Sequence, residues 1–200
     1  MFPPIPPATR ALIIANGVVF LLQFVAGGTM YVIFALWPLS YGFLPWQIVT
    51  YSFMHAGLTH LLLNMFALYM FGGEIERVVG QRRYLAYYFV CVLSAAAAQL
   101  VVTAFLAASP YPTVGASGGV FGILLAFAMY FPRRMILLII PPVPMPAWLF
   151  VTLFGILELY FGVTGTRAGV AHFAHLGGMV GGYLMIRHWR GRPPFGRGRF

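Results

Sequence analysis

Long apolar stretches, separated by short segments rich in proline, glycine or arginine, make up most of this chain. No Asp, Glu, Lys or Arg occurs from position 11 to 73 or from position 84 to 132. Because a helix that crosses a bilayer is mainly apolar along its length, the pattern predicts six spanning helices. Their predicted ranges are residues 11–27, 58–79, 83–105, 117–131, 146–161 and 169–188. We therefore predict an all-α integral membrane protein whose six helices form one bundle, residues 11–188.

The segments outside these helices differ in composition. Residues 1–10 contain four prolines and lack the features of a signal peptide. Residues 189–200 form a basic tail that we expect to be disordered. The uncharged segment between the first two helices, residues 28–57, is dense in aromatic rings, which favour the headgroup region. We therefore predict a loop embedded in the outer membrane interface. Residues 135–140 are apolar but too short to span.

The composition agrees with a membrane location, since 61% of the residues are hydrophobic and only 8% are charged, whereas soluble domains carry about 25% charged residues. The formal charge of +9 comes from arginine, because the chain contains no lysine. With six spans and cytoplasmic termini, only Arg167 of the 12 arginines lies outside. We therefore predict a multi-pass protein of a bacterial inner membrane, and we attribute the charge to orientation instead of nucleic-acid binding.

Two residue types restrict the chemistry. Cys91 is the single cysteine, so the chain has no internal disulfide and no CxxC metal site. Asp is absent, which excludes a Ser-His-Asp triad. A zinc site built from histidines would lack the H-E-x-x-H motif, and we expect no carboxylate near them. The sequence therefore argues against a zinc site at these histidines.

A cluster of small residues, Gly-Ala-Ser-Gly-Gly-Val-Phe-Gly at 115–122, contains one hydroxyl group. The preceding Ser-Pro-Tyr-Pro-Thr segment cannot be helical, so the fourth helix is predicted to begin at Ser117. Gly118 and Gly122 lie one turn apart, and one interpretation is a packing face of small residues. The other interpretation is a nucleophilic serine, and the depth of Ser117 in the membrane bears on the choice.

Three polar side chains have similar predicted depths. With a rise of about 1.5 Å per residue from the cytoplasmic charges, Ser117, His175 and His60 lie about 24, 18 and 21 Å above the inner edge of a core about 30 Å thick. Polar groups at such depths usually face a bundle interior or a water-filled cavity. A structural role suffices for each histidine alone, but a serine beside a histidine can act as a nucleophile. His55 and His172 lie less deep, and we assign them structural roles.

Neighbouring positions on two helices fit the same site. Asn64 follows His60 by four residues, so both side chains lie on one helix face. They could donate hydrogen bonds to a developing oxyanion, or they could hold helices together. Gly178 and Gly182 share a face with His175, and small residues permit close helix contact. We therefore predict that the fourth and sixth helices meet at this face.

These motifs resemble those of the rhomboid intramembrane serine proteases. They are Gly-Ala-Ser-Gly at 115–118, Ala-His-x-x-Gly at 174–178 and His-x-x-x-Asn at 60–64. The resemblance covers nearly the whole chain as a six-helix core. It implies that Ser117 is the nucleophile and His175 the general base, in a dyad without an acid.

The resemblance also implies an oxyanion hole formed by Asn64, His60 and the backbone N–H of Ser117. Supporting positions would be Gly115, Ala116, Gly118, Phe121, Gly122 and Gly178. Phe121 stands where the family commonly has a tyrosine that stacks on the histidine, so stacking is expected without a hydroxyl. Trp46-Gln47 stands where many relatives carry Trp-Arg, and Glu76-Arg77 matches a position that ties the inner loops together.

The implied reaction is hydrolysis of a peptide bond in or near the transmembrane segment of a single-pass membrane protein, within membrane lipid. It would need neither a metal nor an organic cofactor. Two alternatives remain open at the level of sequence. One is an inactive relative that binds transmembrane helices. The other is a small transporter, which would place polar residues along a path through both leaflets.

Overall fold

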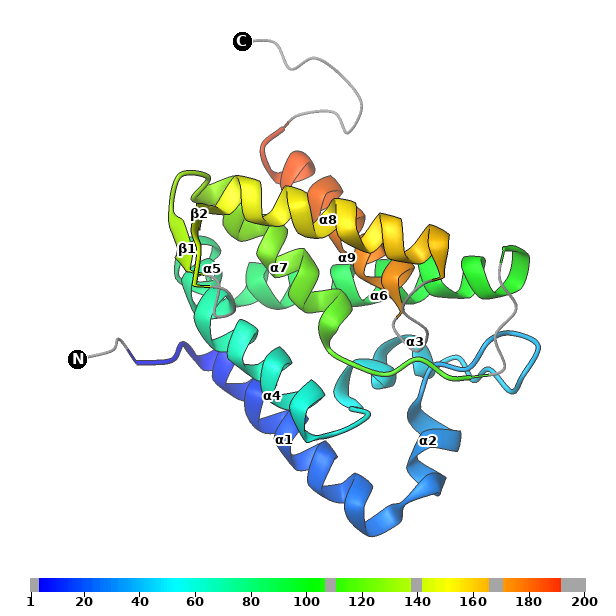
Figure 1. Ribbon diagram of the computed structural model, residues 1–200. Coiled ribbons are helices and arrows are strands. Elements are labelled where there is room, and N and C mark those ends of the chain that lie inside the picture. The colour runs from blue at the N-terminus through cyan, green and yellow to red at the C-terminus, as the bar shows by residue number, and fades with distance from the viewer. Residues whose placement is uncertain (1–3, 107–110, 138–141, 166–170, 192–200) are drawn as a thin grey trace.

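The computed structural model describes residues 4–106, 111–137, 142–165 and 171–191, which are mostly helical (Figure 1). The helices are α1 (Pro7–Ala26), α2 (Gly28–Phe34), α3 (Gln47–Thr50), α4 (Leu58–Ala67), α5 (Gly73–Val79), α6 (Gln81–Phe105), α7 (Ser117–Tyr130), α8 (Ala147–Thr164) and α9 (His172–Trp189). A 3₁₀ turn, Tyr51–Phe53, follows α3, and a π-helical segment, Leu68–Gly72, joins α4 to α5. Two short antiparallel strands, β1 (Met135–Leu137) and β2 (Pro144–Pro146), pair beside α8.

Four helical runs are long and apolar enough to cross a membrane, which supports an integral membrane protein. They are Pro7–Ala26, Leu58–Val79, Gln81–Phe105 and Ala147–Thr164. The remaining two predicted spans correspond to α7, which is apolar but has 14 residues, and α9, which has 18 residues and many glycines. The count of six spans stays a prediction.

Helices α6, α7 and α9 form the centre of the bundle, where glycines let backbones approach closely. A Cβ atom added at Gly177 would lie 2.7 Å from the carbonyl oxygen of Ser94 on α6. A Cβ atom at Gly178, on the neighbouring face of α9, would overlap the carbonyl oxygen of Gly118 on α7. The predicted contact between the fourth and sixth helices is therefore present, and it positions both helices of the candidate site.

Glu76 of α5 holds the beginning of α1. Its carboxylate accepts hydrogen bonds from the backbone N–H groups of Ala8 (2.9 Å) and Thr9 (2.7 Å) and from the Thr9 hydroxyl (2.8 Å). First-turn N–H groups have no partner within their own helix, and a negative charge there is favourable. Together with a proline in the first turn, these bonds explain why α1 begins at Pro7, earlier than the predicted position 11.

Several arginine side chains make contacts at the end of the bundle where α1 begins. Arg77 donates to the carbonyl of Pro4 (2.8 Å), and Arg134 lies 3.3 Å from the carboxylate of Glu74. Arg190, after α9, donates to the carbonyl of Met129 near the end of α7 (3.2 Å). This clustering agrees with arginines on one side of a membrane, although the cytoplasmic orientation stays a prediction.

The aromatic segment between α1 and α4 is folded around a buried amide. Gln47, fully buried, accepts hydrogen bonds from the backbone N–H groups of Trp37 and Leu44 (both 3.1 Å). Its side-chain nitrogen lies 3.3 and 3.2 Å from the carbonyl oxygens of Val32 and Ile33. A neutral amide therefore anchors this segment.

Several predicted boundaries need correction. α6 begins at Gln81, and α8 ends at Thr164 because Gly165 adopts the left-handed conformation that favours a helix end (φ 66°). In the short apolar segment 135–140, Met135–Leu137 form strand β1, and residues 138–140 lie outside the described residues. α9 begins at His172, while the predicted residues 169–170 and most of the tail, 192–200, lie outside the described residues.

Candidate active site

Ser117 is the first residue of α7, and the segment before it is fixed to the aromatic segment. Thr113 and Leu36 exchange two backbone hydrogen bonds of 2.9 Å, and the N–H of Gly115 donates to the carbonyl of Tyr51 (3.0 Å). Gly115 has φ 129°, a conformation that strongly favours glycine. The turn places the partly accessible Ser117 at a helix N-terminus, where free N–H groups favour negative charge.

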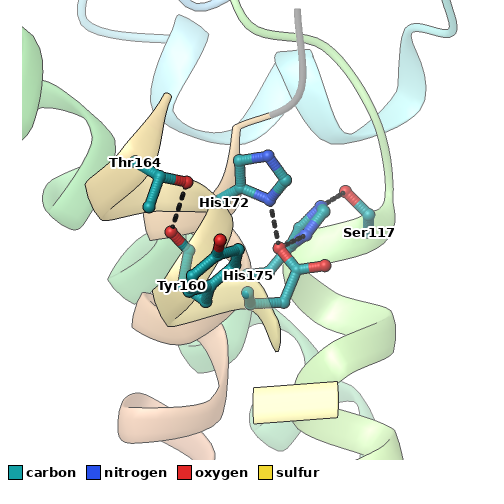
Figure 2. Close-up of polar contacts among 6 residues, drawn as sticks. Ser117, Tyr160, Thr164, His172 and His175 are labelled. Atoms are coloured by element: carbon teal, nitrogen blue, oxygen red, sulfur yellow. Dashed lines mark hydrogen bonds and ion pairs between the residues drawn. The ribbon is translucent and has the colours of Figure 1, made fainter. Parts of the chain in front are cut away.

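His175 of α9 contacts this serine directly. Its Nε2 atom lies 2.8 Å from the Oγ atom of Ser117 (Figure 2). The ring of Phe121, one turn after the serine, stacks on the imidazole with centroids 4.3 Å apart and planes inclined by 5°. The contact predicted between Phe121 and His175 is therefore present, and stacking of this kind contributes about 0.5–1.5 kcal/mol. The imidazole is restrained on its face and at Nε2.

A carboxylate with no role predicted from the sequence also contacts the imidazole. The Oε2 atom of Glu158, on α8, lies 2.8 Å from the Nδ1 atom of His175. The same oxygen lies 2.7 Å from the Nδ1 atom of His172. The expectation that no carboxylate lies near these histidines is therefore wrong, whereas the catalytic dyad itself stays a prediction. His172, for which the sequence predicts a structural role, thus contacts the same carboxylate as His175.

A usable signal for Glu158 was present in the sequence. It is the one charged residue of an 18-residue apolar helix, and ionisable side chains inside a span are functional candidates by default. Glu158 lies twelve residues after Pro146, which corresponds to a rise of about 18 Å. That is the depth predicted for His175.

His60 lies beside Gly115 and Ser117, and Asn64 follows His60 by one turn of α4. A Cβ atom added at Gly115 would lie 2.8 Å from the Nε2 atom of His60 and 3.5 Å from the Oγ atom of Ser117. The His60 imidazole and the Ser117 hydroxyl therefore both border the small space beside Gly115, which the side chain of any other residue would enter. The buried Asn64 donates from Nδ2 to the carbonyl of His60 (2.8 Å), one turn back in α4. His55 is fully buried, with its ring edge-on to His60 at 5.1 Å.

Comparison with known proteins gives the family. Residues 42–190, more than half of the chain and including every candidate site residue, match the rhomboid domain. The chain belongs to the rhomboid family. It is 31% identical over 141 residues to the rhomboid protease GluP of Bacillus subtilis, and 31% identical over 146 residues to the mitochondrial rhomboid protein 1 of Saccharomyces cerevisiae. It is 33% identical over 76 residues to the rhomboid protease GlpG of Klebsiella pneumoniae.

Each of these matches covers a larger share of this rhomboid than of the relative. The match to GluP covers 70% of the chain and 25% of the relative, and that to the yeast protein covers 69% and 40%. The match to GlpG covers 37% and 28%. The chain thus spans less than half the length of each of these three relatives.

Glycines bring the helices of this rhomboid together at the site. A Cβ atom added at Gly118 would overlap the side chain of Ala95, and one at Gly122 would overlap the sulfur of Cys91, both on α6. The Gly122 carbonyl also accepts a hydrogen bond from the Tyr87 hydroxyl (2.7 Å). The small residues after Ser117 therefore form a packing face, in addition to their position beside the serine.

The histidines and Glu158 also have the donor atoms of a metal site. Oε2 of Glu158 and the Nδ1 atoms of His172 and His175 lie within 4.8 Å of one another. Donor atoms about 2.0–2.2 Å from a tetrahedral zinc lie roughly 3.3 Å apart. The contacts of 2.7 and 2.8 Å to one carboxylate oxygen are shorter and match charge-assisted hydrogen bonds. The geometry of this rhomboid therefore fits hydrogen bonding better than metal coordination.

Proposed function

We propose that this rhomboid is an intramembrane serine endopeptidase that uses Ser117 as nucleophile and His175 as general base. The observation that carries the proposal is the 2.8 Å contact between Oγ and Nε2, a distance suited to proton transfer. Membership of the family supports the same chemistry, since two of the three relatives named above are called proteases.

The reaction follows from the positions of the groups. Nε2 of His175 takes the Ser117 proton as Oγ attacks the scissile carbonyl carbon, and it then protonates the leaving amine. Water attacks the acyl-enzyme in a second step with the same proton transfers. The backbone N–H of Ser117, at the start of α7, is one donor to the oxyanion. His60 and Asn64 are the side-chain donors, and the sequence of steps requires neither metal nor organic cofactor.

The substrates are single-pass membrane proteins, cleaved in or near their transmembrane segment within membrane lipid. A helix hides its own carbonyl groups, so the substrate must unwind locally, which residues of low helix propensity favour. We place residues 11–188 as a six-span protease domain, although α1 begins at Pro7. The flanking residues 1–10 and 189–200 belong in the cytoplasm of a bacterial cell, with the bundle in its inner membrane.

Cleavage of a model transmembrane substrate in proteoliposomes tests the proposal. Wild-type protein should cleave it, and Ser117→Ala and His175→Ala should not. Ser94→Ala is the matched control, since Ser94 lies on α6 against Gly181 and not beside His175. Undiminished cleavage by Ser117→Ala would refute the assignment. A wild-type protein that binds the substrate without cleaving it would support an inactive relative.

A further inference from the structure

Glu158 is a carboxylate inside an apolar helix, α8. The other side chains of α8 are uncharged, and several, including Ile156, Leu157, Leu159 and Tyr160, are exposed in the manner of lipid-facing residues. The side chain of Glu158 is only 13% exposed and is directed at α9. An ionisable group inside an apolar span is expensive unless it is paired. The residues that pair with it are His172 and His175.

The contacts determine which ring nitrogen of His175 carries the proton. An ionised carboxylate only accepts hydrogen bonds, so the Nδ1 atom 2.8 Å from it must be the N–H donor. A neutral imidazole with its proton on Nδ1 has a lone pair on Nε2. Nε2 is the atom that faces the Ser117 hydroxyl at 2.8 Å. The carboxylate therefore selects the tautomer in which His175 can accept the serine proton.

We propose that Glu158 is a positioning residue of the reaction, forming with His175 and Ser117 a Glu-His-Ser relay in which His172 restrains the carboxylate. This inference rests on the proposed protease function and adds a third group to the expected pair. Its basis is that one oxygen, Oε2, contacts both imidazoles at 2.7 and 2.8 Å. Figure 2 shows His172 and His175 converging on this point, with Ser117 on the far side of His175.

The proton balance is complete without further reactants. The Oγ–H bond of Ser117 breaks as Oγ bonds to the carbonyl carbon, and the proton moves to Nε2. His175 is then an imidazolium with protons on both nitrogens, and the negative charge of Glu158 stabilises it. Glu158 keeps its charge throughout. The Nε2 proton passes to the leaving nitrogen as the C–N bond breaks, which restores the neutral imidazole.

Steady-state kinetics of three variants separate positioning from packing. Glu158→Gln keeps the shape but loses the charge, so kcat should fall about 10²-fold or more while KM changes little. Glu158→Asp keeps the charge and should retain more activity than Glu158→Gln. His172→Gln leaves the hydrogen bond between Glu158 and His175 intact, so its kcat should fall less than about tenfold. Glu158→Gln activity within threefold of wild type would overturn the inference.

A spectroscopic test reads the tautomer of His175 in the wild-type protein itself. Nitrogen NMR of ¹⁵N-histidine-labelled protein in lipid, with the His175 signals assigned from their loss in His175→Gln, reports the tautomer. The inference requires a proton on Nδ1 of His175, and a proton on Nε2 alone would overturn it. Activity lost on chelation and restored by zinc would also overturn it, because the three side chains would then hold a metal.

These experiments also separate the inference from the proposed function. If Ser117→Ala is inactive and Glu158→Gln is fully active, the protease assignment stands and the relay is wrong. If Ser117→Ala cleaves as well as wild type, the protease assignment itself fails. The tautomer of His175 is measured independently of either outcome.

Discussion

Replacing Gly178 with alanine should disable the Ser117–His175 pair while leaving the protein folded. The added Cβ atom would lie 2.8 Å from the carbonyl carbon of Gly118 and would overlap its oxygen. Both atoms belong to the backbone, so no side chain can rotate away. Because carbon contacts prefer about 3.5–4.0 Å, α7 and α9 must separate by roughly 1 Å.

This displacement would act directly on the site. Gly178 follows His175 by three residues and Gly118 follows Ser117 by one. A separation of roughly 1 Å would lengthen the 2.8 Å contact between Nε2 and Oγ beyond hydrogen-bond range. Overpacking of this kind costs about 1–3 kcal/mol of unfolding free energy. The rate of reaction with a fluorophosphonate probe should therefore fall more than about tenfold, with a moderate decrease in melting temperature.

The matched control is Gly155→Ala. Gly155, on α8, also faces α9, but its added Cβ atom would lie 3.5 Å from the terminal carbon of Met179, an ordinary contact. That variant should react with the probe at the wild-type rate. A Gly178→Ala protein that reacts at the wild-type rate would show that the helix contact does not set the geometry of the pair.

Two further substitutions separate chemistry from stability. Asn64→Ala should lower turnover by about 10²–10³-fold if it loses an oxyanion donor, and unchanged turnover in the cleavage assay would assign Asn64 to packing. Glu76→Gln should weaken three hydrogen bonds to the start of α1 and lower the unfolding free energy by at least about 2 kcal/mol, with little change in the probe reaction of the folded protein. An unchanged melting temperature would contradict this role of Glu76.

The predicted membrane depth of the polar residues was the feature of the sequence that located the candidate site. A fixed helical rise brought Ser117 and His175 to similar levels, and the structure has them in contact. The same arithmetic places Glu158 at this depth. The absence of Asp does not exclude an acid, because a glutamate can occupy the position that an aspartate would fill.

Other features could not be obtained from the pattern. The cited hydrogen bonds of the buried Gln47 side chain run to backbone groups 10 and 15 residues earlier in the chain, and no periodicity marks such contacts. The early start of α1 depends on Glu76, 68 residues from Ala8. Strand β1 exists through pairing with β2, whose prolines argue against a strand when read alone. In each case tertiary contacts decide the local structure.

The most direct test of the central claim is to locate the covalent product of a fluorophosphonate on the folded protein. Mass spectrometry of the digested wild-type protein should find the phosphonyl adduct on Ser117, and the same treatment of His175→Ala should give almost none. An adduct on a different residue, or equal modification of Ser117 without the His175 imidazole, would contradict the proposal that these two side chains form the catalytic pair.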